Sequence, residues 1–230
     1  MDRPLPHDFG TNSARQGSVK AHRGPSPVRQ RQSVSYYARQ DHAARRAREE
    51  SYSARSVFKL QELDHRYMLL KPGMCVLDLG CAPGSWLEYA APKVGSRGFC
   101  LGVDLVPVQQ ELPNTRFEQG DALDPALLSR LASEHGIRYF DLVLCDMSPR
   151  LTGIRAQDQE RALALWTAAL DTARAWLRPD GALVVKLFEG GGHTELIQRA
   201  KQLFTRVELM RPKTTRKHSR EIYLVGLGKL

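Results

Sequence analysis

The strongest constraint on the fold is an alternation of short apolar runs with longer amphipathic patterns, which begins near residue 74. Continuous apolar runs are typical of strands that are buried on both faces. Seven runs are predicted as strands: 74–79, 98–104, 115–120, 140–146, 181–188, 205–210 and 221–228. Helical patterns lie between them, near 85–94, 125–136, 157–177 and 193–204. This alternation predicts an α/β fold, a doubly wound and mostly parallel sheet with helices on both faces.

The last two predicted strands are separated by a loop too short for a parallel crossover. We therefore expect an antiparallel hairpin at the edge of the sheet, with the last strand reversed. A seven-stranded sheet of this kind resembles the Rossmann-like fold of class I S-adenosylmethionine-dependent methyltransferases.

The part of the chain before the first strand divides into three segments. Residues 1–35 are rich in Pro, Ser, Gln and Arg and lack periodicity, which predicts a disordered basic tail. An organellar presequence is the alternative interpretation of this Arg- and Ser-rich segment. Residues 36–55 are polar and favour a basic helix, and residues 56–70 have the spacing of an amphipathic helix. We expect one domain, 36–230, preceded by a tail.

Composition excludes several classes of protein. No apolar run approaches the roughly 18 residues of a membrane span, and the N-terminal residues lack the apolar core of a secretory signal. Cys75, Cys81, Cys100 and Cys145 form no C-x-x-C pair, so we expect reduced, buried thiols in a cytoplasmic protein. The histidines are scattered and none has a cysteine at ligand spacing, so no metal site is predicted.

The net charge of +9 is unevenly distributed. Residues 1–55 hold eleven Lys and Arg against five Asp and Glu, and 211–220 hold five basic residues and no acidic ones. Two basic segments beside a nearly neutral domain favour a polyanionic partner, with RNA or DNA first. The alternative interpretation is that the tail and the loop are solvated segments that bind no polyanion.

A glycine loop follows the first predicted strand, in 76-VLDLGCAPGSWLEYA-90. Gly80 and Gly84 are spaced G-x-x-x-G and not G-x-G-x-x-G, the pattern of a dinucleotide site. Asp78 stands two residues before the first glycine. A carboxylate at this place disfavours a diphosphate, which helix N-termini bind through N–H groups. It favours an ammonium group such as that of S-adenosylmethionine.

Two further acidic residues follow the next strands of the predicted sheet. Asp104 ends the second strand, where an acid can accept hydrogen bonds from ribose hydroxyls, and Asp121 follows the third, where it can bind the adenine amino group. Each alone is equally consistent with a helix cap. Together with Asp78 they predict an S-adenosylmethionine site.

Six stretches resemble motifs of the FtsJ/RrmJ-type RNA ribose 2′-O-methyltransferases, in the order in which that family has them. They are 53-SARSVFKLQELD-64, 78-DLGCAPGSW-86, 120-GDALD-124, 145-CDMSP-149, 184-VVKLF-188 and 219-SREIYLV-225. The resemblance runs from about residue 36 to the C-terminus and is greatest to the bacterial branch that methylates a uridine in 23S-type ribosomal RNA. The chain departs from that branch at Arg150, where Asn is usual.

The resemblance implies a catalytic tetrad of Lys59, Asp146, Lys186 and Glu221. Lys186 also stands out without it, because lysine is rare inside a buried apolar strand unless it is paired. For Asp146 and Glu221 the alternative to a catalytic role is an ordinary charge at the end of a strand, and for Lys59 it is an ordinary surface lysine. The implied cofactor-binding residues are Asp78, Gly80, Pro83, Gly84, Trp86, Asp104, Asp121 and Asp146.

The chemistry accounts for such a set of residues. A ribose 2′-hydroxyl is a weak nucleophile, whereas the sulfonium of S-adenosylmethionine is already a good leaving group. The enzyme must align the hydroxyl with the methyl carbon and remove its proton. We expect Lys186 to act as the base or to orient the oxygen, Asp146 to steer Lys186 and help hold the donor, and Lys59 and Glu221 to fix the geometry, with no metal ion.

The expected partner is ribosomal RNA, within the large subunit, bound by a monomer. Candidate phosphate contacts are Arg45, Arg46, Arg48, Arg55, Lys213, Arg216 and Lys217. Two alternatives remain at this stage: a transfer-RNA ribose 2′-O-methyltransferase of the same family, and a non-catalytic ribosome-assembly factor that binds RNA.

Overall fold

The computed structural model describes residues 43–149, 152–189, 193–216 and 218–230. The predicted tail 1–35, Arg150 and Lys217 lie outside these residues. The strands are β1 (Cys75–Leu79), β2 (Phe99–Asp104), β3 (Thr115–Gln119), β4 (Phe140–Cys145), β5 (Leu177–Phe188), β6 (Phe204–Met210) and β7 (Glu221–Lys229). The helices are α2 (Val57–Tyr67), α3 (Ser85–Val94), α4 (Pro125–Glu134), α5 (Arg155–Trp176) and α6 (Thr194–Leu203).

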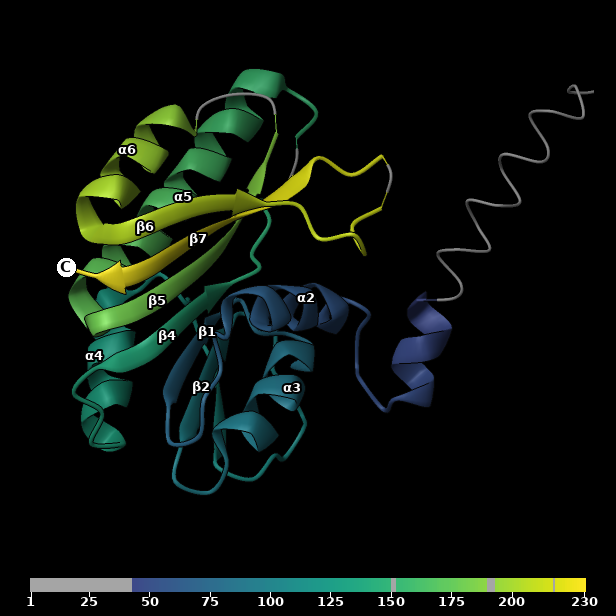
Figure 1. Ribbon diagram of the computed structural model, residues 1–230, viewed down its shortest axis with the longest axis vertical. Helices are drawn as coiled ribbons and strands as arrows, with labels where there is room; N and C mark the ends of the chain where they lie inside the picture. Colours follow the sequence, from purple (N-terminus) through teal and green to yellow (C-terminus); the bar gives the residue numbers. More distant parts are fainter. Residues whose placement is uncertain (1–42, 150–151, 190–192, 217) are drawn as a thin grey trace, which may run out of the picture. The chain divides into compact units, whose positions relative to one another are not determined.

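The seven strands form one sheet in the order β3-β2-β1-β4-β5-β7-β6 (Figure 1). The pairs from β3 to β5 are parallel, and β7 is antiparallel to both of its neighbours. The predicted doubly wound, mostly parallel sheet with a reversed last strand is therefore confirmed. β6 forms the edge, and β7 lies one place further in, between β5 and β6.

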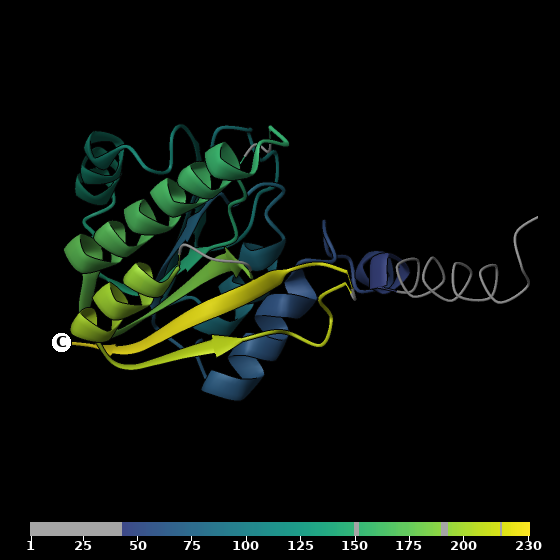
Figure 2. The ribbon, with the colours of Figure 1, turned by 90° about the horizontal axis from the view of Figure 1, so that it is seen from above.

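Helices cover both faces of the sheet, with α4, α5 and α6 on one side and α2 and α3 on the other (Figures 1 and 2). Strand side chains alternate between the two cores that result. In β1, for example, Leu77 belongs to the core under α4, α5 and α6, whereas Val76 belongs to the core under α2 and α3. Alternation then places Asp78 on the α2–α3 face as well.

Two element boundaries differ from the sequence prediction. Helix α2 ends at Tyr67 and not at Leu70, because Met68 adopts a left-handed conformation (φ 54°) and the Asp64 carboxylate accepts the Leu70 N–H. Strand β5 begins at Leu177, four residues before the predicted start, and its register with β4 shifts between Phe140 and Leu142. Such irregular pairing cannot be recognised from an apolar run.

Of the basic helix predicted over 36–55, the structure describes a helical segment at residues 43–49. Ala47 is buried in it and packs with Val57 and Phe58 of α2. This contact attaches the segment to the rest of the domain. No described helix is both long and apolar enough to cross a membrane.

All four cysteines are free, and Cys81, Cys100 and Cys145 are buried. Cys75 is half-buried, so the predicted burial holds for three of the four. Burial raises the pKa of the Cys145 thiol to about 12, which keeps it protonated and unreactive at neutral pH.

Candidate active site

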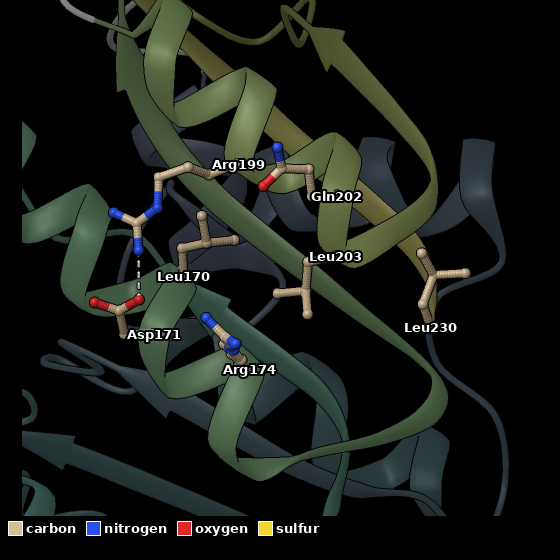
Figure 3. Close-up of a pocket in the computed structure, with 7 residues that line it drawn as sticks. All are labelled: Leu170, Asp171, Arg174, Arg199, Gln202, Leu203 and Leu230. Atoms are coloured by element: carbon tan, nitrogen blue, oxygen red, sulfur yellow. Dashed lines mark hydrogen bonds and ion pairs between the residues drawn. The ribbon is translucent and has the colours of Figure 1, made fainter.

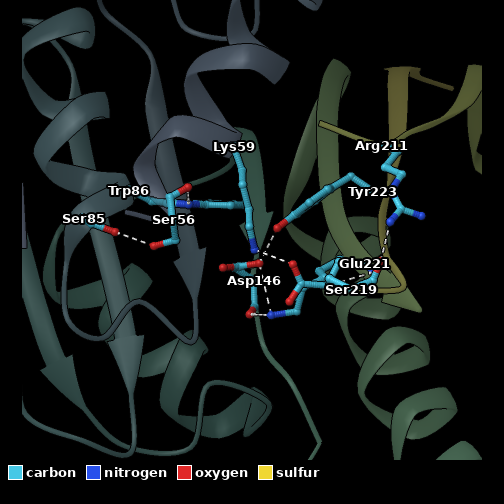
Figure 4. A network of polar contacts seen from close by, with 10 residues as sticks. Ser56, Lys59, Ser85, Trp86, Asp146, Arg211, Ser219, Glu221 and Tyr223 are labelled. Atoms are coloured by element: carbon cyan, nitrogen blue, oxygen red, sulfur yellow. Dashed lines mark hydrogen bonds and ion pairs between the residues drawn. The ribbon is translucent and has the colours of Figure 1, made fainter. Parts of the chain in front are cut away.

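The structure brings the four predicted tetrad residues together at the carboxyl ends of the parallel strands. Figure 4 labels three of them, Lys59, Asp146 and Glu221. Asp146 follows β4 directly, and Lys186 lies near the carboxyl end of the neighbouring strand β5. Because β7 runs antiparallel, its first residue, Glu221, lies at the same end of the sheet, opposite Phe188. Lys59 extends from α2, which covers this face of the sheet. Residues up to 162 positions apart in the chain thus share one site.

Two ion pairs connect these residues. Lys59 Nζ lies 2.6 Å from Glu221 Oε2, and Lys186 Nζ lies 3.2 Å from Asp146 Oδ1. Lys186 also donates a hydrogen bond to the backbone carbonyl of Asp146. With only 5% of its surface exposed, Lys186 is held in one orientation by a carboxylate and a carbonyl.

Tyr223 completes the network, and the sequence analysis missed it. Its hydroxyl donates to Asp146 Oδ1 over 2.7 Å, and its ring centroid lies 5.9 Å from Lys59 Nζ. Tyr223 pairs with Lys186 across the β5–β7 ladder. In the sequence it reads as an apolar member of a strand. Its position two residues after Glu221, on the same face of that strand, was the available signal.

The charges of the site are mutually stabilised. Burial raises the pKa of the Glu221 carboxyl, but the hydrogen bond and charge of Lys59, with the charge of Lys186, outweigh it, so that this pKa lies below its ordinary value. Burial and the adjacent Asp146 charge hold the pKa of the Tyr223 hydroxyl well above its ordinary range. Tyr223 is therefore a permanent hydrogen-bond donor at neutral pH.

A cavity of about 770 Å³ lies beside the tetrad and shares Asp146 with it. Its walls come from the loops after β1, β2, β3 and β4 and from α5, at the carboxyl ends of the parallel strands where doubly wound sheets bind ligands. The lining residues are Gly80, Ala82, Asp104, Leu105, Asp121, Ala122, Leu123, Asp146, Met147, Ser148, Pro149, Arg161, Ala164, Leu165 and Ala168.

Two of the predicted acidic residues line this cavity and also hold its loops. Asp104 accepts the Ala82 N–H through Oδ2 and the Val106 N–H through Oδ1, at 2.9 and 2.8 Å. Asp121 Oδ1 accepts the Leu123 N–H at 2.9 Å. A carboxylate has about four acceptor sites. Both side chains therefore keep acceptor capacity for a ligand.

Asp78 lies outside this lining and is the least satisfied charged group of the site. Its side chain is buried, and neither carboxylate oxygen has a hydrogen-bond partner among the described residues. Burial, together with the charges of Asp146 and Asp104, raises the pKa of Asp78 well above its ordinary value. A cation with N–H donors at this position would supply the missing partners, and the ammonium of S-adenosylmethionine is such a group.

The glycine loop permits close approach of the backbone to its surroundings. Gly80 has φ +76°, and a Cβ there would lie 2.2 Å from Met147 Cγ. Gly84 has φ +108°, and a Cβ there would lie 2.9 Å from Gln110 Oε1. No other residue adopts these conformations at so little cost.

Pro83, Gly84 and Trp86 were predicted to contact the cofactor, and none of them lines the cavity. The Trp86 indole N–H donates to the Ser56 carbonyl at 3.0 Å, and its ring lies 6.0 Å from the ring of Tyr223. Trp86 is buried in the core formed with α2 and α3. In this position it supports the residues around Lys59.

The predicted phosphate contacts differ in their surroundings. Arg45 and Arg46 form ion pairs with Glu49 and Glu50, one helical turn away. Arg48, Lys213 and Arg216 are exposed. The loop that contains Lys213 and Arg216 lies against α2, next to the tetrad.

A second cavity, of about 230 Å³, lies between α5 and α6 (Figure 3). Its charged lining includes an ion pair between Arg199 and Asp171 at 2.6 Å. None of the tetrad residues reaches it. The smaller cavity is therefore separate from the tetrad, whereas the larger one shares Asp146 with it.

Known proteins similar to this chain carry the same type of domain. The model of the FtsJ-like methyltransferase family matches residues 52–229. Ribosomal RNA large subunit methyltransferase E of Bdellovibrio bacteriovorus is 47% identical over 194 residues, which cover 84% of this chain and 98% of that protein. The protein of the same name from Desulfatibacillum aliphaticivorans is 46% identical over 190 residues, which cover 82% of this chain and 90% of that protein.

A solved structure agrees with this assignment. The crystal structure of a ribosomal RNA methyltransferase from Plasmodium falciparum matches with a TM-score of 0.69 and 26% identity. The match covers 78% of this chain and 99% of that one. Since the family model matches residues 52–229 and relatives 46–47% identical cover most of its length, the chain belongs to the FtsJ-like methyltransferase family.

Proposed function

We propose that this methyltransferase moves a methyl group from S-adenosylmethionine to the 2′-hydroxyl of a uridine ribose in large-subunit ribosomal RNA. The observation that carries the proposal is the ion pair of the buried Lys186 with Asp146, which lines the cavity together with Asp104 and Asp121. Relatives at 46–47% identity carry the name of a large-subunit ribosomal RNA methyltransferase, which supports the choice of RNA.

The acidic residues fit the methyl donor. The Asp78 carboxylate lacks partners and suits the donor's ammonium, while Asp104 and Asp121 keep free acceptor sites for hydroxyl and amino groups. When bound, S-adenosylmethionine supplies an electrophilic methyl group on a sulfonium. No activation of the donor is then needed, and the protein has to act on the acceptor.

Lys186 is the residue that acts on the acceptor oxygen. Its ammonium is fixed by Asp146, so one N–H can point to an incoming hydroxyl and orient the lone pair that attacks. As the methyl carbon leaves the sulfur and bonds to this oxygen, the hydroxyl proton passes to the Asp146 carboxylate, while Lys186 stays an ammonium. Tyr223 keeps the Asp146 carboxylate in place, and the Lys59–Glu221 pair closes the opposite side. Tyr223, Lys59 and Glu221 thus contribute to the reaction by positioning the reacting groups, and the last two also by their charge.

We propose further that a monomer suffices, that the protein acts in the cytoplasm and that no metal ion takes part. All four tetrad residues and the cavity come from one chain. The cytoplasm follows from the proposed substrate. The donor's own positive charge removes the need for a Lewis acid.

The decisive experiment uses the purified protein and methyl-labelled S-adenosylmethionine. Large ribosomal subunits and transfer RNA, both from cells that lack the gene, are the two acceptors. We expect label in the large-subunit RNA, recovered as 2′-O-methyluridine after nuclease digestion. Label in transfer RNA alone would favour the transfer-RNA enzyme.

Calorimetry with S-adenosylmethionine and with NAD separates the remaining outcomes. We expect S-adenosylmethionine to bind and NAD to give no heat. Binding of the donor without label in either RNA would favour the non-catalytic assembly factor. Binding of NAD in place of the donor would contradict the assignment of the cavity.

A further inference from the structure

The basic loop between β6 and β7 is held by a carboxylate on a different element. The backbone N–H groups of Lys213 and Thr214 donate to Glu62 Oε2 and Oε1, over 2.6 and 2.9 Å. Glu62 lies on α2 and is half-buried. Two consecutive N–H groups on one carboxylate are charge-assisted hydrogen bonds, which are stronger than neutral ones.

Helix α2 binds this loop at both ends. Glu62 binds its beginning, and Lys59, three residues earlier in the helix, binds Glu221 directly after the loop at 2.6 Å. Residues three apart lie on the same face of a helix. Figure 2 shows the loop, in yellow, running alongside α2. The conformation of the loop and the position of a tetrad residue therefore depend on the same helix face.

The base of the loop is closed independently of α2. The Arg211 guanidinium lies 3.1 Å from Glu189 Oε2 and donates to the Ser219 carbonyl. The Glu189 N–H donates to the Arg220 carbonyl at 2.7 Å. With the base of the loop closed in this way, Lys213 and Thr214 are the places where, among the described residues, Glu62 holds the loop backbone to the domain.

The side chains next to this anchor point outward. Lys213 and Arg216 are exposed, and within the described part of the chain neither side chain makes a hydrogen bond or an ion pair. Thr215, between them, is buried, so the backbone here faces the domain while the two cations face solvent. A fixed backbone with free cations is suited to binding phosphates at defined positions.

We propose that Glu62 is a positioning residue that holds the β6–β7 loop at Lys213 and Thr214 so that the Lys213 and Arg216 side chains contact RNA phosphates beside the tetrad. The inference rests on the proposed RNA substrate. Glu62 itself would repel RNA by its charge, but that charge is directed to two backbone N–H groups. Removing the Glu62 side chain should therefore weaken RNA binding if the residue positions the loop, and should strengthen it if only the negative charge matters.

The test compares Glu62→Ala and Glu62→Gln with Glu134→Gln. Glu134 lies at the end of α4, where it binds Arg130, and its replacement changes the net charge by the same amount. Charge alone predicts slightly tighter RNA binding for all three variants. We expect Glu62→Ala instead to weaken binding of large-subunit RNA about tenfold or more, since two charge-assisted bonds that order the loop are lost.

Two further readouts identify the mechanism of that loss. The dependence of RNA affinity on salt should become shallower in Glu62→Ala, because fewer phosphates are neutralised. KM for RNA should rise more than kcat falls, and affinity for S-adenosylmethionine should stay unchanged. Glu62→Gln should be intermediate, because its amide oxygen can accept from only one of the two N–H groups.

Hydrogen exchange at the Lys213 and Thr214 amides provides a measurement that does not involve RNA. Both should exchange faster in Glu62→Gln than in wild type, while Glu134→Gln leaves them unchanged. RNA binding by Glu62→Ala as tight as in Glu134→Gln would overturn the proposal. Unchanged amide exchange in Glu62→Gln would also overturn it. If Glu62→Ala does not fold, the RNA affinity of Glu62→Gln is compared with that of Glu134→Gln instead. A wild-type protein that methylates no RNA would refute the proposed function, whereas the exchange result tests the anchor itself.

Discussion

Lys186 interrupts the apolar run of β5, where burial of an ammonium is costly unless a partner compensates for it. The Asp146 carboxylate and backbone carbonyl provide that compensation. Asp146 is in turn bound by the Tyr223 hydroxyl, so its position does not depend on Lys186 alone. A variant at Lys186 should therefore report on chemistry more than on folding.

Replacing Lys186 by Met keeps most of the unbranched side chain and removes the charge. We expect single-turnover methylation at saturating donor and RNA to slow by about 10²–10⁴, the usual range for a group that assists proton transfer, because the ammonium that orients the oxygen and holds Asp146 is lost. Binding of both ligands and the melting temperature should change little. Lys201→Met, on the exposed face of α6, is the matched control. Near-normal turnover in Lys186→Met would show that Lys186 neither orients the oxygen nor assists the proton transfer.

Asp78 presents the opposite case, a buried carboxylate without partners. Because its pKa in the folded protein is raised above the ordinary 3.8, the folded state binds more protons than the unfolded state. The stability that proton binding at Asp78 contributes is therefore fully present below pH 3.8 and is lost as the pH rises through the pKa of the folded protein. Asp78→Asn should remove this loss, and so should raise the melting temperature of the ligand-free protein at neutral pH.

The same variant should bind S-adenosylmethionine about 10- to 100-fold more weakly, because an amide cannot pair with the donor's ammonium as a carboxylate does. Thermal denaturation with and without the donor measures both effects. If Asp78→Asn melted below wild type and still bound the donor normally, Asp78 would have a structural role and no part in the donor site.

The sequence predicted the site residues whose charge interrupts an apolar run, and it did not predict those whose role depends on contacts with residues far away in the chain. Lys186 and Asp78 break apolar runs, and Lys59 and Glu221 followed only from the family resemblance. Tyr223 looks like any apolar strand residue. Glu62 looks like the polar face of an amphipathic helix, and its partner Lys213 lies 151 residues away. No periodicity encodes such a contact.

At the scale of elements, the strands and helices were predictable because buried parallel strands and amphipathic helices have different periodicities. The exceptions are element ends that are fixed by tertiary contacts, such as the stop of α2 at Met68. The shapes of the loops around the cavity are likewise fixed by tertiary contacts. Their sequence predicted a binding site, but their shape depends on contacts such as that between Asp104 and the Ala82 N–H.

The loop after β1 offers a test of this dependence. Gly80→Ala combines a left-handed backbone with a clash against Met147, whereas Gly136→Ala has a similar φ of +64° and no atom within 4 Å of the new Cβ. The backbone cost of about 1–2 kcal/mol should be common to both. Only Gly80→Ala should also lose binding of S-adenosylmethionine, measured by calorimetry. Equal donor affinity in the two variants would show that the approach of Gly80 to Met147 is irrelevant to the site.

At the scale of the whole molecule, residues 1–35 remain a sequence-based prediction. Their removal should leave melting temperature and donor binding unchanged, because the segment lacks the apolar residues for a core. RNA affinity should fall and its salt dependence should become shallower, as fewer phosphates are neutralised. Filter binding over a series of salt concentrations measures this slope. An identical slope for the full and shortened chains would assign the tail no part in RNA binding.

The place of β7 between β5 and β6 has a consequence for how the protein is made. Both of its neighbours are synthesised first. β5 can already pair with β4, but β6 pairs only with β7 and so joins the sheet only after β7 has been made and has paired with β5. That strand also brings Glu221 and Tyr223. The chain therefore has neither the complete sheet nor the complete tetrad until β7 has been made and paired, so that completing the sheet and assembling the candidate active site are one event.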